Sequence, residues 1–129
     1  RELQTHTRIP IAGGETLASV QETYRYLSGG AFQLLQLDVH NLGGITPWLR
    51  AAALGAATGI PVASHLTQEV CVHLLCATPP ATLLEYMPVC NPFMIRPLAI
   101  GADGTVRPSD VAGHGVEFNR DLIEGYKVA

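Results

Sequence analysis

The chain contains 129 residues, of which 47% are hydrophobic and 15% are charged, and its formal net charge is −3 at pH 7. A chain of this length and apolar content can bury the core of one domain. Its slightly acidic charge gives no reason to expect nucleic acid or an anionic membrane surface as a partner. Because no apolar run approaches the roughly 20 residues of a membrane span, and no basic-then-apolar leader is present, we expect a soluble protein.

The cysteines indicate the compartment. Cys71, Cys76 and Cys90 are odd in number and show no C-x-x-C spacing. This pattern favours neither a disulfide framework nor a zinc site. We therefore predict that they are buried free thiols in a reducing compartment, which is typical of a cytoplasmic protein.

The first elements predicted along the chain are a strand and a helix. Residues 1–8 are polar and typical of the end of a connection, whereas residues 9–12 form an apolar run that predicts a short buried strand. Apolar side chains then recur at helical spacing over residues 16–27. Gly29 and Gly30 follow this stretch and are typical of a helix C-terminus.

The same alternation follows in the next segment. Residues 34–37 predict a second strand, and residues 46–58 predict a second helix with Thr46 as its N-cap. We interpret Gly43-Gly44 as the tight turn before this helix, since the segment lacks the further glycine of a dinucleotide fingerprint and the lysine of a phosphate-binding loop. Trp48 is assigned to packing, as is usual for a single aromatic side chain on a helix.

A third strand and helix come next, and a fourth strand closes the series. Residues 60–63 predict the third strand, and residues 68–77 predict a third helix that Pro79 and Pro80 end. Residues 83–84 predict the fourth strand, which is very short. Strand and helix thus alternate through three crossover units, each expected to be right-handed.

Beyond Pro88 the alternation stops. Residues 99–106 predict a hairpin that turns at Asp103-Gly104, and the remaining tail, rich in proline and glycine, ends in residues 122–128. No strand or helix is predicted before Ile9, so the sheet edge there is expected to be open to another segment.

These elements predict an α/β fold with four parallel strands. A TIM-type barrel needs eight strands and typically about 250 residues. Four strands therefore correspond to half of such a barrel. We interpret the chain as the C-terminal part of a longer protein.

An ionisable residue follows each predicted strand: Glu15, Asp38, His65 and Glu85. Successive members lie 20 to 27 residues apart, enough for a strand and the roughly dozen-residue crossover that parallel strands require. The C-terminal ends of parallel strands converge on one rim, where barrels and open α/β sheets assemble their sites. The pattern therefore predicts an active site at this rim.

Three of these residues also have an ordinary structural interpretation. Glu15 is compatible with a carboxylate at a helix N-terminus, His65 with a structural histidine, and Glu85 with a surface carboxylate at a strand end. The remaining histidines lie off the rim pattern and are assigned structural or exposed positions: His6, His40, His73 and His114.

Four short motifs carry the rim residues: residues 11–15 (IAGGE), Asp38 with residues 42–46 (LGGIT), residues 60–66 (IPVASHL) and residues 84–86 (LEY). Together they resemble the last four barrel strands of the mandelate racemase/muconate lactonizing enzyme family, in its mandelate racemase-like branch, within the enolase superfamily. The resemblance runs from about residue 9 to residue 115. It is specific because four functional positions, their order and their spacings fit together.

The resemblance implies a modified TIM-type (β/α)₇β barrel. Residues 1–90 then form its C-terminal half, and residues 91–129 form a tail with a hairpin that packs on the barrel or on a capping domain. The capping domain and the first barrel strands are absent from the chain. The family's basic motif on an early strand and two further metal carboxylates are also absent, and the only lysine is Lys127.

The resemblance also implies the role of each rim residue in Mg²⁺-assisted removal of a proton next to a carboxylate. Glu15 resembles a metal ligand, which suits the oxygen preference of Mg²⁺. His65 resembles the general base, because imidazole carries protons near neutral pH, and Asp38 the carboxylate that orients it. Glu85 resembles a carboxyl group that hydrogen-bonds to a substrate carboxylate oxygen.

The implied function is that of an acid-sugar dehydratase. The alternative within the family is a racemase or epimerase of 2-hydroxy acids, and an alternative of another class is a non-catalytic half-barrel serving assembly. The expected partners are a small carboxylate (a sugar acid or a 2-hydroxy acid) and the missing N-terminal part of the same protein, in a homo-oligomer. The 129 residues alone are expected to be inactive, because the lysine motif and two carboxylates are missing.

Overall fold

Four parallel strands form one sheet in the order β1-β2-β3-β4. The structure, a computed structural model, describes residues 2–79 and 81–128. The strands are β1 (Ala12–Gly13), β2 (Leu34–Asp38), β3 (Val62–His65) and β4 (Ala81–Leu83). The helices are α1 (Glu2–His6), α2 (Val20–Ser28), α3 (Ile45–Thr58), α4 (Gln68–Cys76), the 3₁₀ helix η1 (Pro88–Phe93) and α5 (Arg120–Glu124).

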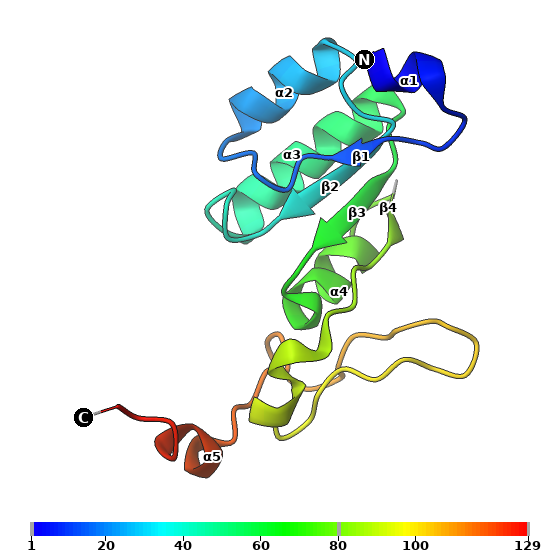
Figure 1. Ribbon diagram of the computed structural model, residues 1–129. Coiled ribbons are helices and arrows are strands. Elements are labelled where there is room, and N and C mark those ends of the chain that lie inside the picture. The colour runs from blue at the N-terminus through cyan, green and yellow to red at the C-terminus, as the bar shows by residue number, and fades with distance from the viewer. Residues whose placement is uncertain (1, 80, 129) are drawn as a thin grey trace.

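Helices α2, α3 and α4 connect successive strands and lie along one face of the sheet (Figure 1). The core lies between this face and the helices. Leu35 and Leu37 of β2 are fully buried in it, and Trp48 of α3 is fully buried beside them. Trp48 Nε1–H donates to the Leu37 carbonyl at 3.2 Å, which confirms the packing role predicted for this side chain.

The other face of the sheet carries the rim residues. Successive side chains of a strand point to opposite faces, so Asp38 lies on the face opposite Leu37. The register pairs Asp38 with His65 on β3. Neighbouring residues of parallel strands share a face, and this pairing therefore brings the two side chains together.

The first strand and helix are shorter than predicted. The pairing of β1 is limited to Ala12 and Gly13, and Ile9 is 74% exposed rather than buried. Helix α2 begins at Val20 because Ser19 caps it, its side chain accepting the Glu22 N–H at 3.1 Å. The apolar periodicity that starts at residue 16 therefore includes loop residues that pack on the core.

The prediction that Thr46 is an N-cap is wrong. Gly44 occupies the N-cap position of α3, and no side chain caps it. Both Gly43 and Gly44 have positive φ angles, 86° and 119°, a conformation that glycine adopts without steric cost. The two glycines turn the chain so tightly that Thr46 already lies in the first helical turn.

The other boundaries differ less. Helix α4 ends one residue earlier than predicted, at Cys76, and β3 lies two residues later than predicted. Strand β4 begins two residues earlier than predicted and ends one residue earlier, and its pairing with β3 shifts register between Val62 and Ala63. Pro79 follows α4, whereas Pro80 lies outside the described residues. The predicted parallel sheet with its helical crossovers is confirmed.

Two terminal segments add detail to the predictions. A short helix, α1, precedes Ile9, where no element was expected, and Gln4 ties it to the Ala31 carbonyl at 2.9 Å. The predicted hairpin forms an antiparallel bridge between Ile100 and Val106. Helix α5 is the regular part of the C-terminal segment, and it begins two residues before Leu122.

The prediction that the cysteines are buried is correct for only one of the three residues. Cys71 is buried, and burial, followed by the nearby Asp38 and Glu69 carboxylates, raises the pKa of its thiol to about 12. Cys76 and Cys90 are exposed, because they lie at the end of α4 and in η1, away from the core. All three are free thiols. In the described part of the chain, no helix is long and apolar enough to cross a membrane.

Candidate active site

Three of the four rim residues predicted from the sequence are carboxylates, and they gather around the fourth, His65. His65 lies with Nδ1 2.8 Å from Asp38 Oδ2, while Nε2 lies 3.6 Å from Glu15 Oε2 and 4.0 Å from Glu85 Oε2. Each carboxylate comes from a different strand end or the residues just beyond it. The predicted convergence on one rim is therefore present.

Asp38 is held rigidly at the end of β2. Its Oδ1 accepts the backbone N–H groups of His40 at 2.7 Å and Asn41 at 2.8 Å, and its Oδ2 faces the His65 ring. Burial by itself raises the pKa of the Asp38 carboxyl, but the hydrogen bonds from Asn41, His65 and His40 outweigh it. The pKa is lowered overall, and Asp38 is therefore a carboxylate at neutral pH.

The Asp38 carboxylate sets the orientation and tautomer of the His65 ring. A carboxylate is only an acceptor, so Nδ1 must carry the hydrogen that it donates to Asp38, and a neutral ring then has an unprotonated Nε2. Nε2 faces the rim, and the His65 side chain is 21% exposed. The ring is therefore arranged to take a proton at Nε2.

Gly14 directs Glu15 toward the rim. Gly14 has φ +121°, and a Cβ at this position would lie 2.9 Å from the Gln36 carbonyl oxygen and 3.0 Å from Leu35 Cδ1. Only glycine permits the chain to pass so close to β2. The Glu15 carbonyl accepts the Asn41 Nδ2–H at 2.8 Å, while its side chain stays half exposed.

Glu85 is held by the residues that flank His65. The backbone N–H of Leu66 donates to Glu85 Oε2 at 2.8 Å, and the backbone N–H of Glu85 donates to Ser64 Oγ at 3.1 Å. The Glu85 side chain is 33% exposed, and its Oε2 lies 4.0 Å from His65 Nε2. One of its carboxyl oxygens therefore has a fixed partner.

Several residues that support the rim were missed in the sequence. Asn41, Ser64 and Gln68 bear no charge and stand inside or beside apolar runs, so no charge pattern singles them out. The available signal was position, since Ser64 directly precedes His65 and Gln68 follows it by three residues. Their hydrogen-bond partners are distant in sequence and are decided only by the folded chain.

The rim residues differ in whether they could serve as a ligand of a hard cation. Within residues 2–79 and 81–128, no three His, Cys, Asp or Glu side chains form a group that could hold a metal ion. Asp38 is occupied by His65 and by two backbone N–H groups. The half-exposed Glu15 carboxylate has the donor chemistry that Mg²⁺ prefers, so it fits one oxygen ligand of such an ion.

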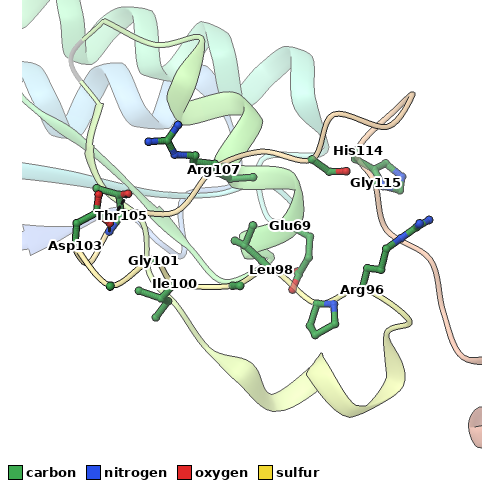
Figure 2. A pocket seen from close by; sticks show the side chains of 15 residues that line it. Glu69, Arg96, Leu98, Ile100, Gly101, Asp103, Thr105, Arg107, His114 and Gly115 are labelled. Atoms are coloured by element: carbon green, nitrogen blue, oxygen red, sulfur yellow. Dashed lines mark hydrogen bonds between the residues drawn. The ribbon is translucent and has the colours of Figure 1, made fainter.

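A separate hollow lies away from the rim. A depression of about 740 Å³ lies between α4 and the tail, and its lining contains none of the four rim residues. Figure 2 shows Arg96 and Arg107 at its border extending away from each other, with Glu69 between them. Arg96 instead pairs with Glu117 at 2.6 Å. The charged groups do not converge, so this hollow has no built ligand site.

Comparison with known proteins matches the chain over nearly its whole length. The profile of the family described as enolase C-terminal domain-like matches residues 1–122. A 3,6-anhydro-alpha-L-galactonate cycloisomerase from Streptomyces coelicolor is 35% identical over 85% of this chain and 31% of its own length. An L-talarate/galactarate dehydratase from Salmonella typhimurium is 37% identical over 84% of this chain and 27% of its own.

Solved structures agree. An enolase from the alpha proteobacterium bal199, with bound magnesium, superposes with a TM-score of 0.91 at 31% identity, over 96% of this chain and 34% of that one. The Salmonella typhimurium LT2 dehydratase, liganded with magnesium and L-lyxarohydroxamate, gives a TM-score of 0.86 at 32% identity, over 95% of this chain and 31% of that one. The chain thus spans about a third of the length of these relatives.

Proposed function

Because this chain belongs to the enolase C-terminal domain-like family, we propose that it is the C-terminal half-barrel of a Mg²⁺-dependent enzyme that removes the proton next to a carboxylate. One observation carries this proposal. His65 Nδ1–H donates to Asp38 Oδ2 at 2.8 Å, while His65 Nε2 lies 3.6 Å from Glu15 and 4.0 Å from Glu85.

His65 is the general base in this proposal. Nε2 takes the proton from the carbon next to the substrate carboxylate, and the ring becomes an imidazolium. Asp38 stabilises that positive charge and keeps the ring oriented, as a buried carboxylate does for a catalytic histidine. Its lowered pKa supports this role, because Asp38 remains ionised while the ring gains a proton.

The two glutamates act on the substrate carboxylate. Glu15 would be one ligand of Mg²⁺, which when bound supplies positive charge to the carboxylate of the substrate. Glu85 Oε2 also lies near His65 Nε2, at 4.0 Å. We assign it a hydrogen bond to a carboxylate oxygen, for which the Glu85 carboxyl must carry the proton.

The substrate class that we propose is a sugar acid. Two relatives are named for acting on sugar acids, a galactonate derivative and talarate or galactarate. In a substrate with a hydroxyl group β to the carboxylate, the intermediate expels that hydroxyl as water, with His65 returning its proton to the leaving oxygen. Reprotonation on the opposite face of a 2-hydroxy acid would instead make the enzyme a racemase or epimerase.

The rest of the assembly belongs to the same proposal. Residues 1–90 form the half-barrel, and residues 91–129 form a tail that packs on the barrel or on the capping domain. The partner is the N-terminal part of the same protein, which brings the remaining metal ligands and the basic motif. We propose a cytoplasmic homo-oligomer.

The test measures proton exchange in the full-length enzyme. Sugar acids and 2-hydroxy acids are incubated with Mg²⁺ in deuterated water, and deuterium at the carbon next to the carboxylate is followed by NMR. General-base catalysis contributes about 10²–10⁴-fold, so His65→Asn is expected to reduce turnover by that factor. His114→Asn, in the tail, is the matched control and leaves turnover unchanged. Exchange at wild-type rates for every epimer in His65→Asn would contradict the proposal.

A further inference from the structure

The backbone pairing of the sheet stops before Glu85. Strand β4 ends at Leu83, which pairs with Ala63, and the register between β3 and β4 has already shifted. Main-chain hydrogen bonds of the sheet therefore do not determine where Glu85 lies. Its side chain is nevertheless 4.0 Å from His65 Nε2, so other contacts must hold it.

Three residues around His65 supply those contacts, and we call Ser64, Leu66 and Gln68 the Glu85 clamp. Ser64 Oγ accepts the Glu85 N–H at 3.1 Å, and the Leu66 N–H donates to Glu85 Oε2 at 2.8 Å. Gln68 Oε1 accepts the Met87 N–H at 2.6 Å. Ser64 is fully buried and Gln68 is 2% exposed, so these two acceptor side chains are shielded from water.

The backbone between Ser64 and Gln68 is strained. Leu66 and Thr67 have φ angles of 49° and 44°, in the left-handed region that non-glycine residues avoid. Such a strained conformation persists only where surrounding contacts enforce it. In this left-handed turn the Leu66 N–H donates to the Glu85 carboxyl group.

Gln68 extends the clamp to the tail. Its Nε2–H donates to Asn91 Oδ1 at 3.3 Å, and Asn91 Nδ2–H donates to the Tyr86 hydroxyl at 3.0 Å. That hydroxyl donates to the Leu98 carbonyl at 2.8 Å. The residues that directly follow Glu85 are therefore held as well.

We propose that Ser64 is a positioning residue that, together with Leu66 and Gln68, keeps the Glu85 carboxyl group beside His65 Nε2. The proposal rests on the function assigned above, since it presumes that Glu85 contacts the substrate. The Ser64 hydroxyl replaces the strand pairing that is missing beyond Leu83. Without it, the partly buried Glu85 N–H loses its acceptor, and the segment is expected to move to find another.

A double-mutant cycle in the full-length enzyme tests the proposal. Displacements of about 1 Å can lower rates about 100-fold, so Ser64→Ala is expected to lower kcat about 10- to 100-fold with little change in Mg²⁺ affinity. In a Glu85→Gln background, Ser64→Ala is expected to have no further effect, because the group that it positions is already altered. Multiplicative losses in the double variant would overturn the proposal.

The control is a second hydroxyl between the same strands. Thr82 Oγ1 donates to the Val62 carbonyl at 3.2 Å, away from Glu85, so Thr82→Val should leave kcat unchanged. The crystal structure of Ser64→Ala provides a test that does not depend on activity. In that structure, Glu85 is expected to move away from His65. An unmoved Glu85 would overturn the clamp. If the wild-type enzyme showed no proton exchange, only the proposed function would be refuted. The position of Glu85 in the wild type and in Ser64→Ala would still decide whether the clamp exists.

Discussion

The two parts of the chain differ in how they are held together. We call residues 2–79 and 81–87 the body and residues 88–128 the tail. Every buried apolar side chain lies in the body, between Leu17 and Leu75. No residue of the tail is buried, and Figure 1 shows it extending away from the sheet. The body is thus stabilised by burial of apolar surface, and the tail by turns and scattered hydrogen bonds.

This difference explains where the candidate site lies. A proton-transfer site requires distances fixed within fractions of an ångström, and close-packed cores provide such rigidity. His65 and Asp38 stand on paired central strands whose other face is the core. The tail meets the clamp through Asn91, which accepts from Gln68 Nε2–H and donates to the Tyr86 hydroxyl of the body.

The largest expected effect tests the core directly. Trp48→Ala removes a fully buried side chain and should reduce the free energy of unfolding by about 3–5 kcal/mol. Phe118→Ala, in the tail and 51% exposed, should cost less than about 1 kcal/mol. Urea unfolding of the full-length protein, followed by circular dichroism, measures both. Equal losses would mean that the tail is buried against another part of the protein.

The next largest effect is expected on Mg²⁺ affinity and turnover, when a carboxylate of the body and one of the tail are replaced. Glu15→Gln removes an anionic oxygen from the proposed cation site, so Mg²⁺ affinity and turnover should fall together by at least about 10-fold. Asp110→Asn, in the tail, should change neither. Titration of activity against free Mg²⁺ measures both variants. An unchanged Mg²⁺ dependence in Glu15→Gln would remove Glu15 from the ligand set.

Acid should act on the body through Asp38. Its folded pKa is lowered, so its stabilising contribution is present above the unfolded pKa of about 3.9 and is lost as the pH falls through the folded value. Asp38→Asn should therefore destabilise at pH 7, by about 1–3 kcal/mol for hydrogen bonds to a charged group, and less below pH 4. The free energies of unfolding of the wild type and of Asp38→Asn are measured across this range. A difference between them that does not narrow toward low pH would contradict this stabilising role of Asp38.

Asp103 in the tail is the control for that experiment. Hydrogen bonds from the Thr105 N–H and hydroxyl lower the pKa of its carboxyl group as well. The group is exposed, however, and solvent screens its charge. Asp103→Asn should accordingly alter the pH dependence of unfolding far less than Asp38→Asn.

The smallest effect concerns left-handed backbone. The body places Thr67 at φ 44°, whereas the tail places Gly104 at φ 77°. Thr67→Gly should relieve strain and raise the free energy of unfolding by about 1 kcal/mol. Gly104→Ala should lower it by about the same amount, since a Cβ there meets no atom within 4 Å and only conformation changes. Melting temperatures of both variants check the opposite signs.

The sequence predicted the elements better than their boundaries. Apolar runs and helical spacing located the four strands and three crossover helices. Boundaries depended on local hydrogen bonds, such as the Ser19 cap that delays α2 and the glycine turn that displaces Thr46 from the N-cap. Helix α1 has five residues, too few for periodicity to reveal it.

For the candidate site, too, the sequence predicted one part and the folded chain determined the other. By itself, the sequence determined that Glu15, Asp38, His65 and Glu85 share a rim, because strand direction and crossover length are properties of a local pattern. Their catalytic roles stay predictions. The tertiary structure alone decided that Asp38 meets Nδ1, that Glu15 and Glu85 flank Nε2, and that Ser64 holds Glu85. Those contacts join residues about 20 or more positions apart, and their distances follow from strand register and buried hydrogen bonds, which no local pattern encodes.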